Sequence, residues 1–235
     1  MFKIISLLII TTLFSSAYWF YNKINTPQND SNIRVTNLPW QITIVNSKTT
    51  HVFGLDIGTA TLEQAVKILK SEYHLAWFEN KDQSISLEAY FIRVNLSGLR
   101  AKIVLELDTT DIDIKYLKQN SGKPEILASH AIKYPLDDLT YAMSKRTIKS
   151  LTYIPKSSVD SDLLQQRFGS AAKVSVLNNN TEFWLYPKKG LVMTINKKGK
   201  EAFQYVPLAD FERLESSIEK TVDLSNNSTS SSSNK

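Results

Sequence analysis

The chain has 235 residues, 42% of them hydrophobic, and its 28 basic and 23 acidic side chains give a formal net charge of +5 at pH 7. Lysines alternate with acids in most segments, which indicates a solvated surface and argues against a nucleic-acid-binding protein. Cysteine is absent, which excludes disulfides and the lipid-modified cysteine of a bacterial lipoprotein. If a chain without cysteine is exported, a bacterial envelope suits it better than a eukaryotic secretory route, where small domains often rely on disulfides.

Residues 1–24 predict a transmembrane signal anchor. No charged side chain lies between Lys3 and Lys23, and residues 4–22 would span about 28 Å as a helix, close to the roughly 30 Å core of a bilayer. The segment ends in four aromatic residues, which suit a membrane interface. Because the short positive end tends to stay inside, we expect a single-pass protein of the inner membrane with its C-terminal domain in the periplasm.

The alternative is a signal peptide that is cleaved near Ala17, which would release a secreted protein. Ser15, Ser16 and Ala17 are small enough for such a cleavage site. Cleavage there would leave the aromatic cluster at the start of a soluble chain, so the retained anchor is favoured. Both interpretations place the remaining residues outside the cytoplasm, where we expect neither nucleotide nor nucleic acid as a partner.

Residues 25–37 are polar, contain Pro27 and predict a tether. A first α+β unit is expected over residues 38–124. Apolar alternation predicts strands at 40–45, 51–53, 75–79, 85–96 and 99–108. A helix capped by Thr61 is predicted to run to about Ser71, with an apolar face formed by Leu62, Ala65, Val66 and Leu69. A short helix is predicted at 111–119.

Residues 125–157 are expected to connect this unit to a second one. A helix is predicted at 136–144, and the chain between it and the helix at 111–119 is expected to be irregular. The second α+β unit is predicted over 158–218, opening with a helix that Ser158 caps and Gly169 ends. Four strands are expected at 173–177, 181–186, 191–195 and 201–206. A last helix begins near Leu208, and residues 219–235, rich in Ser and Asn, predict a disordered tail.

A helix followed by an antiparallel meander thus occurs twice, at about 61–108 and at 159–206. We interpret this order as a duplicated module. The predicted fold class is therefore α+β: a single N-terminal transmembrane helix followed by two helix-plus-meander units.

Two resemblances accompany this interpretation. The stretch Gly54 to Ala65, Gly-Leu-Asp-Ile-Gly-Thr-Ala-Thr-Leu-Glu-Gln-Ala, resembles the helix-opening segment of SmpA/OmlA-type small envelope lipoproteins, whose lipid-bearing cysteine is absent here. Over most of its length the chain resembles an uncharacterised family of predicted membrane-anchored bacterial envelope proteins. The motifs that carry this second resemblance are Leu38 to Trp40, Phe168-Gly169, Trp184 to Pro187, Gly190-Leu191, Gly199 to Glu201 and Gln204 to Pro207. The first resemblance implies a scaffold role in outer-membrane protein assembly, and the second implies no activity.

Several short motifs suggest chemistry but have simpler explanations. Gly54 to Thr59 matches the first phosphate segment of actin-like ATPases, yet the chain has only seven glycines and no second phosphate loop, so a turn before the helix explains it better. His51, His74 and His130 have no metal-ligand spacing. Ser129-His130 lacks the context of a nucleophile. The sequence therefore predicts no catalytic, cofactor-binding or metal-binding residues.

The acidic groups Asp108, Asp111 and Asp113, and Asp137 and Asp138, lack the glycine and glutamate of a calcium loop. We expect them at helix N-termini. Lys188 and Lys189, and the lysines at 197–200, lie at opposite ends of one predicted strand. At about 3.3 Å per residue they are too far apart for one phosphate site.

The aromatic residues of two neighbouring strands are the remaining candidates: Phe183, Trp184, Tyr186, Phe203 and Tyr205. One set faces the core, and the other lies either under a second covering layer, the favoured alternative, or on a partner-binding face around Trp184 and Tyr186. We expect a non-catalytic protein-binding or assembly module that partners the membrane through residues 4–22 and another envelope protein. A carrier of a small lipid or peptide between sheet and helices is the alternative, and an envelope hydrolase is a weaker one.

Overall fold

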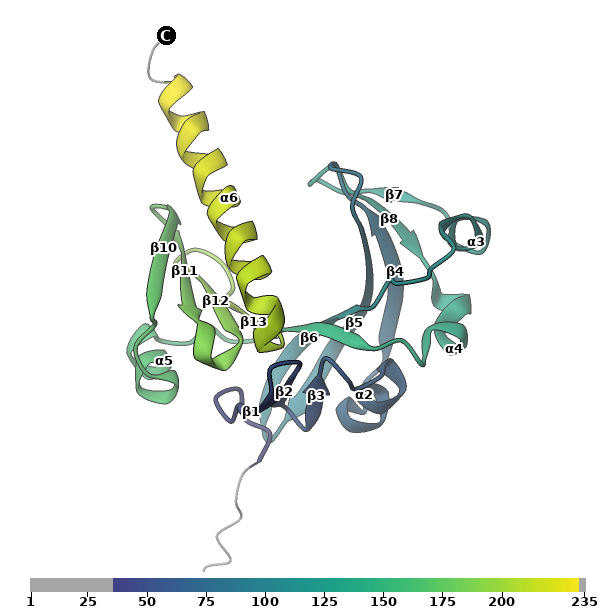
Figure 1. Cartoon of the computed structure of the whole chain (residues 1–235), viewed down its shortest axis with the longest axis horizontal. Helices are drawn as coiled ribbons and strands as arrows, with labels where there is room; N and C mark the ends of the chain where they lie inside the picture. Colours follow the sequence, from purple (N-terminus) through teal and green to yellow (C-terminus); the bar gives the residue numbers. More distant parts are fainter. Residues whose placement is uncertain (1–35, 233–235) are drawn as a thin grey trace, which may run out of the picture. The chain divides into compact units, whose positions relative to one another are not determined.

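The computed structural model describes residues 36–232, so the predicted anchor at 1–24 and most of the predicted tether at 25–37 lie outside it. The strands are β1 (Thr43–Asn46), β2 (Thr49–Val52), β3 (Leu55–Ile57), β4 (Tyr73–Glu79), β5 (Ile85–Leu96), β6 (Leu99–Leu107), β7 (Glu125–Ile126), β8 (Ile132–Pro135), β9 (Ile148–Pro155), β10 (Lys173–Asn178), β11 (Thr181–Tyr186), β12 (Leu191–Asn196) and β13 (Ala202–Tyr205). The helices are α2 (Leu62–Leu69), α3 (Ile114–Gln119), α4 (Thr140–Met143), α5 (Ser161–Phe168) and α6 (Leu208–Ser232), with short 3-10 turns η1 (Asp137–Leu139) and η2 (Pro187–Lys189) (Figure 1). Within this range no helix is both long enough and apolar enough to cross a membrane.

Ten strands form one continuous antiparallel sheet in the order β10-β11-β12-β13-β9-β6-β5-β4-β8-β7. The predicted α+β fold of two helix-plus-meander units is therefore wrong, because strands predominate and both meanders belong to the same sheet. The predicted order of elements within each meander is present: α2 precedes β4-β5-β6, and α5 precedes β10 to β13. The error lies in how the two meanders are joined.

Strand β9 joins them. It lies in the segment predicted to be a connection, and it pairs with β6 on one side and with β13 on the other. Tyr153, for example, is the cross-strand partner of both Ile103 and Phe203. An isolated meander would leave the backbone groups of β6 or β13 unpaired at an edge. β9 satisfies both edges at once and so converts two local motifs into one sheet.

One face of this sheet carries the main core. Successive cross-strand partners form a continuous buried row across seven strands, apart from a half-buried Tyr73: Trp184, Met193, Phe203, Tyr153, Ile103, Phe91 and Tyr73. The small sheet β1-β2-β3 and helix α2 supply the apolar residues that pack with this row, among them the fully buried Phe53, Leu55, Ile57 and Leu62. The predicted hairpin near residues 40–53 and the predicted helix with its Thr61 cap are confirmed, including a capping box with Gln64.

Helix α6 covers part of the opposite face. Phe211 and Ile218 of α6 pack against Leu185, Val192 and Val206, and Figure 1 shows the helix following β13 beside β10 to β12. Lys173 of β10 pairs with both Glu215 and Glu219 on α6. The helix runs to Ser232, so it extends through most of the range 219–235 that was predicted to be a disordered tail. Apolar residues at helical spacing continue as far as Val222 and explain part of this extension.

The cap of α5 differs from the prediction, and a glycine fixes the turn between β11 and β12. Helix α5 is capped by Asp160, whose carboxylate accepts hydrogen bonds from the backbone of Asp162 and Leu163, and not by Ser158. At Gly190, φ is +58° and a Cβ atom would lie 2.1 Å from the carbonyl oxygen of Val206. Only glycine fits this turn between β11 and β12.

Glu63 of α2 forms an ion pair with Lys145 in the turn after α4. The Glu63 carboxylate also pairs, at 3.0 Å, with Lys67. The hydrogen bond from Lys145, supported by Lys67, lowers the pKa of Glu63 to about 2.

Candidate functional site

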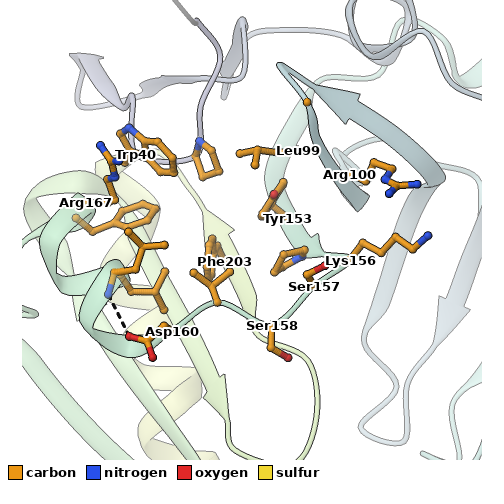
Figure 2. Close-up of a pocket in the computed structure, with 17 residues that line it drawn as sticks. Trp40, Leu99, Arg100, Tyr153, Lys156, Ser157, Ser158, Asp160, Arg167 and Phe203 are labelled. Atoms are coloured by element: carbon orange, nitrogen blue, oxygen red, sulfur yellow. Dashed lines mark hydrogen bonds between the residues drawn. The ribbon is translucent and has the colours of Figure 1, made fainter.

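A hollow of about 430 Å³ lies where the described chain begins, between residues 39–40, helix α5 and the adjoining ends of β6 and β9 (Figure 2). Four separate parts of the sequence line it, namely residues 39–40, 98–100, 153–168 and Phe203, so no local pattern could have identified it. Its volume falls within the range of small-molecule and peptide pockets, roughly 300 to 1,000 Å³.

Aromatic residues of the core form the floor of this hollow. Tyr153 of β9 and Phe203 of β13 stack at 5.7 Å between ring centroids, and Phe168 at the end of α5 meets Phe203 edge to face at 5.7 Å. All three side chains are buried. The three rings therefore form an apolar platform at the bottom of the hollow, and Leu163, which also lines the hollow, adds apolar surface that is 42% exposed.

Pro39 and Trp40 form one wall. The Tyr205 hydroxyl, itself in the core, donates a hydrogen bond of 3.0 Å to the Pro39 carbonyl oxygen. Trp40 packs edge to face on Phe168, with ring centroids 6.2 Å apart, and the guanidinium of Arg167 lies 5.0 Å from the centroid of the Trp40 ring. These contacts hold the wall in position before any ligand arrives.

The rim is polar and mainly basic. Arg100, Lys156 and Arg167 line it together with Ser157 and Ser158. Figure 2 shows the labelled rim residues around the central Phe203. Asp160 is the acidic residue of the lining, and its carboxylate is occupied by the helix cap described above.

The lining offers little for acid–base chemistry. No histidine is among the described residues that line the hollow. Burial raises the pKa of Tyr153 to about 12, so this phenol stays neutral near pH 7. The arrangement is therefore suited to binding: an apolar floor, a preformed aromatic wall and a cationic rim.

A second hollow, of about 450 Å³, lies next to the first and shares Arg100, Pro155 and Lys156 with it. Its floor includes the buried Val94 and Ala101. Its polar lining consists of five basic side chains together with Tyr90 and Asn95.

An acidic pair lies elsewhere on the sheet. Glu88 and Glu106 are direct cross-strand partners, and they accept hydrogen bonds from Ser86 at 3.2 Å and Ser150 at 2.9 Å. Burial raises the pKa of Glu88, and the Glu106 charge raises it further against the opposing effect of Ser86. Neither carboxylate lines either hollow.

The aromatic candidates are covered on both faces. Trp184, Tyr186, Phe203 and Tyr205 belong to the main core, while Phe183 packs on the opposite side in the cluster under α6. The favoured interpretation, a second covered layer, is confirmed. Trp184 and Tyr186 are buried and do not form an exposed partner-binding face.

The other motifs are scattered. The His51 Nδ1 lies 2.6 Å from an Asp56 carboxylate oxygen and the His74 Nδ1 lies 3.4 Å from Asp137, while His130 occupies a turn with φ of +64°. Among the described residues no group of three or more His, Asp or Glu side chains could hold a metal ion.

The acids near helix starts have the expected role in part. Asp113 caps α3, and Asp108 accepts hydrogen bonds from the backbone and hydroxyl of Thr110 before it. Asp137 and Asp138 stand in the first turn of η1 but make no capping hydrogen bond. The segment Gly54 to Thr59 forms β3 and the turn before α2.

Sequence reasoning missed both hollows. The sequence suggests Lys188 and Lys189 as possible companions of the lysines at 197–200, whereas in the structure Lys200 shares a hollow with Lys156 and the basic residues of β5 and β6. One signal was available: Arg100 and Lys102 alternate with the buried Ala101 and Ile103, which places both cations on one face of a strand.

Comparisons of the chain with protein-family models, with curated proteins and with solved structures give no match. The resemblance to envelope protein families therefore stays a prediction. What the chain does has to be inferred from the geometry of its own residues.

Proposed function

We propose that the protein is a non-catalytic binding or assembly module of the bacterial envelope. Residues 4–22 hold it at the inner membrane, its folded part lies in the periplasm, and the first hollow receives a segment of another envelope protein. Anchoring confines the search for such a partner to two dimensions.

The observation that carries this proposal is the hollow beside Trp40, whose floor consists of the buried aromatic platform. Most large apolar side chains of the described part are buried, and the platform of Tyr153, Phe203 and Phe168 is where the core lines a surface hollow. Binding energy at interfaces concentrates in aromatic and arginine residues that lie in such pockets. Trp40 with Arg167 stacked on it has this composition.

A carrier of a small lipid or short peptide is the second candidate. The volume of the hollow, about 430 Å³, favours it, because pockets of this size enclose drug-sized ligands. The two candidates differ in what occupies the hollow, a segment of a folded partner or a free small molecule.

Photo-crosslinking in the native envelope tests both. A benzoylphenylalanine residue replaces Leu163, which lines the hollow and is 42% exposed. We expect a discrete protein adduct that is lost when Trp40→Ala is combined with it. The matched control carries the same probe at Ile126, which is 79% exposed on β7 and outside the hollow.

The outcomes are distinct. An adduct whose added mass is that of a lipid or short peptide would favour the carrier. Identical adducts from both positions would contradict a site at this hollow. A reporter enzyme that works only in the cytosol, fused after Lys235 and found fully active, would contradict the proposed topology.

A further inference from the structure

Basic side chains from β5, from β6, from the end of β9 and from the turn before β13 line the second hollow. Five of its lining side chains are basic: Arg93, Arg100, Lys102, Lys156 and Lys200. No acidic side chain is among the described residues that line it. A surface segment of mixed charge would show both signs, so this concentration needs its own explanation.

Strand geometry puts these groups together. Arg100 and Lys102 alternate with buried residues on β6. In β5 a bulge lies between Phe91 and Val94, so that Ile92 and Arg93 both face the single position of Lys102 across the ladder. A bulge of this kind redirects a side chain, and here both inserted residues are exposed and line the hollow.

The other two cations come from the far side of the β6–β9 ladder. The backbone N–H of Lys156 donates to the Arg100 carbonyl oxygen at 2.9 Å, continuing the pairing beyond β9. The Lys200 ammonium donates to the backbone carbonyl of Lys156, which holds the turn before β13 against the end of β9.

In the part of the chain that the structure describes, no carboxylate forms an ion pair with these five cations. Elsewhere lysines form ion pairs, as Lys118 does with Glu79 and Lys133 with Glu125. Like charges that line one hollow repel one another unless an anion lies between them.

We infer that the partner supplies an extended acidic peptide segment, which passes around the adjoining ends of β6 and β9 from the first hollow, on the core face of the sheet, to the second hollow, on the opposite face. This inference rests on the proposed function and specifies the chemistry of the partner. An apolar side chain of the segment rests on the aromatic floor beside Trp40, and its carboxylates face Arg100 and Lys156, which line both hollows. Further carboxylates meet Arg93 and Lys102.

Shape favours a peptide over a membrane surface. A flat bilayer contacts the protruding parts of a protein surface. These cations instead line a concave site that Val94, Ile154 and Pro155 also line. Two adjoining hollows of about 430 and 450 Å³ also exceed what a single phosphate group needs. An extended chain with alternating acidic and apolar side chains matches both the charges and the apolar floors.

Fluorescence anisotropy with the full chain in phosphatidylcholine nanodiscs tests the inference. The probe is a labelled peptide, Glu-Leu-Glu-Phe-Glu-Leu-Glu, and its comparison is the same peptide with Gln in place of Glu. We expect the acidic peptide to bind about tenfold more tightly or better, and to weaken as NaCl rises from about 50 to about 300 mM.

Matched variants locate the binding. Arg100→Gln with Lys102→Gln removes two charges from the hollow and should weaken the acidic peptide about tenfold. Lys81→Gln with Lys123→Gln removes two exposed charges that line neither hollow, and should change the affinity less than about twofold. Equal losses in the two double variants would overturn the inference, since they would reflect net charge alone.

Three further results also overturn it. If the Glu and Gln peptides bind equally and the Leu163 cross-link is retained, the partner segment need not be acidic, while the proposed function is still supported. If neither peptide binds and that cross-link is retained, the inference of an acidic segment is again wrong, while the proposed function is still supported. Protection of Lys102 and Lys156 from acetylation by phosphatidylglycerol nanodiscs, but not by the acidic peptide, assigns the cations to the membrane surface. Loss of the Leu163 cross-link itself refutes the proposed function.

Discussion

The hydrogen bond from Tyr205 to Pro39 allows a quantitative prediction about the wall of the first hollow. Tyr205 is fully buried, and its hydroxyl lies 3.0 Å from the Pro39 carbonyl oxygen. Burial raises the pKa of Tyr205 well above its ordinary value, so the phenol is protonated and can donate near pH 7. Tyr205→Phe keeps the ring and leaves a buried carbonyl without this partner.

Such a loss costs about 2 kcal/mol, because the unsatisfied carbonyl keeps its desolvation penalty. For a domain of this size that corresponds to a fall in Tm of roughly 4 to 8 °C. Urea unfolding of a chain starting at residue 25, followed by tryptophan fluorescence, measures the change, with m expected to stay constant. Tyr141→Phe is the control, since Tyr141 is 91% exposed, and it should change stability by less than about 0.5 kcal/mol. Equal stabilities of the two variants would refute the assigned role of the hydroxyl.

Three other substitutions test the packing and the charges. Gly190→Ala should lower the free energy of unfolding by at least about 2 kcal/mol, because the new Cβ would lie 2.1 Å from a backbone carbonyl oxygen. Gly98→Ala has open space around the new Cβ and should lower it by about 1 kcal/mol. Chemical denaturation measures the free energy of unfolding of both variants. Leu151→Ala in the middle of β9 should cost roughly 2 to 5 kcal/mol, against less than about 0.5 kcal/mol for Leu224→Ala, which is 71% exposed. The pKa of Glu63 is about 2 in the folded chain and 4.5 ordinarily, so its contribution to stability is complete above pH 4.5 and is lost as pH falls towards 2. Thermal unfolding across this window should show a shallower decline for Glu63→Gln, and parallel declines would contradict the assignment.

Local structure could be predicted from the sequence because its causes are local. Alternation identified β4, β5 and β6 almost to the residue, and the apolar spacing after Thr61 identified α2 with its cap. Turn residues separated β10 from β11 and β12 from β13. Each of these assignments depends on neighbours a few positions away, and the long-range packing of the sheet agrees with the local preference at each of them.

Strand β9 shows why the fold class could not be predicted in the same way. Leu151, Tyr153 and Pro155 alternate with Thr152 and Ile154, so the periodicity of a strand was present. Its place in the sheet is set by partners far away in the sequence on both sides, in β6 and β13. Two meanders with free edges and one shared strand are equally compatible with the local pattern, and only the long-range pairing decides between them.

The second hollow depends even more strongly on such pairing. Arg93 reaches it because of a bulge in β5, Lys156 because β9 pairs with β6, and Lys200 because β13 pairs with β9. If the meanders had formed separate units, Lys200 and Arg93 would belong to different modules and no common site would exist. The charge cluster is thus a product of the joined sheet, and any variant that separates β9 from β13 should abolish acidic-peptide binding even where all five cations remain.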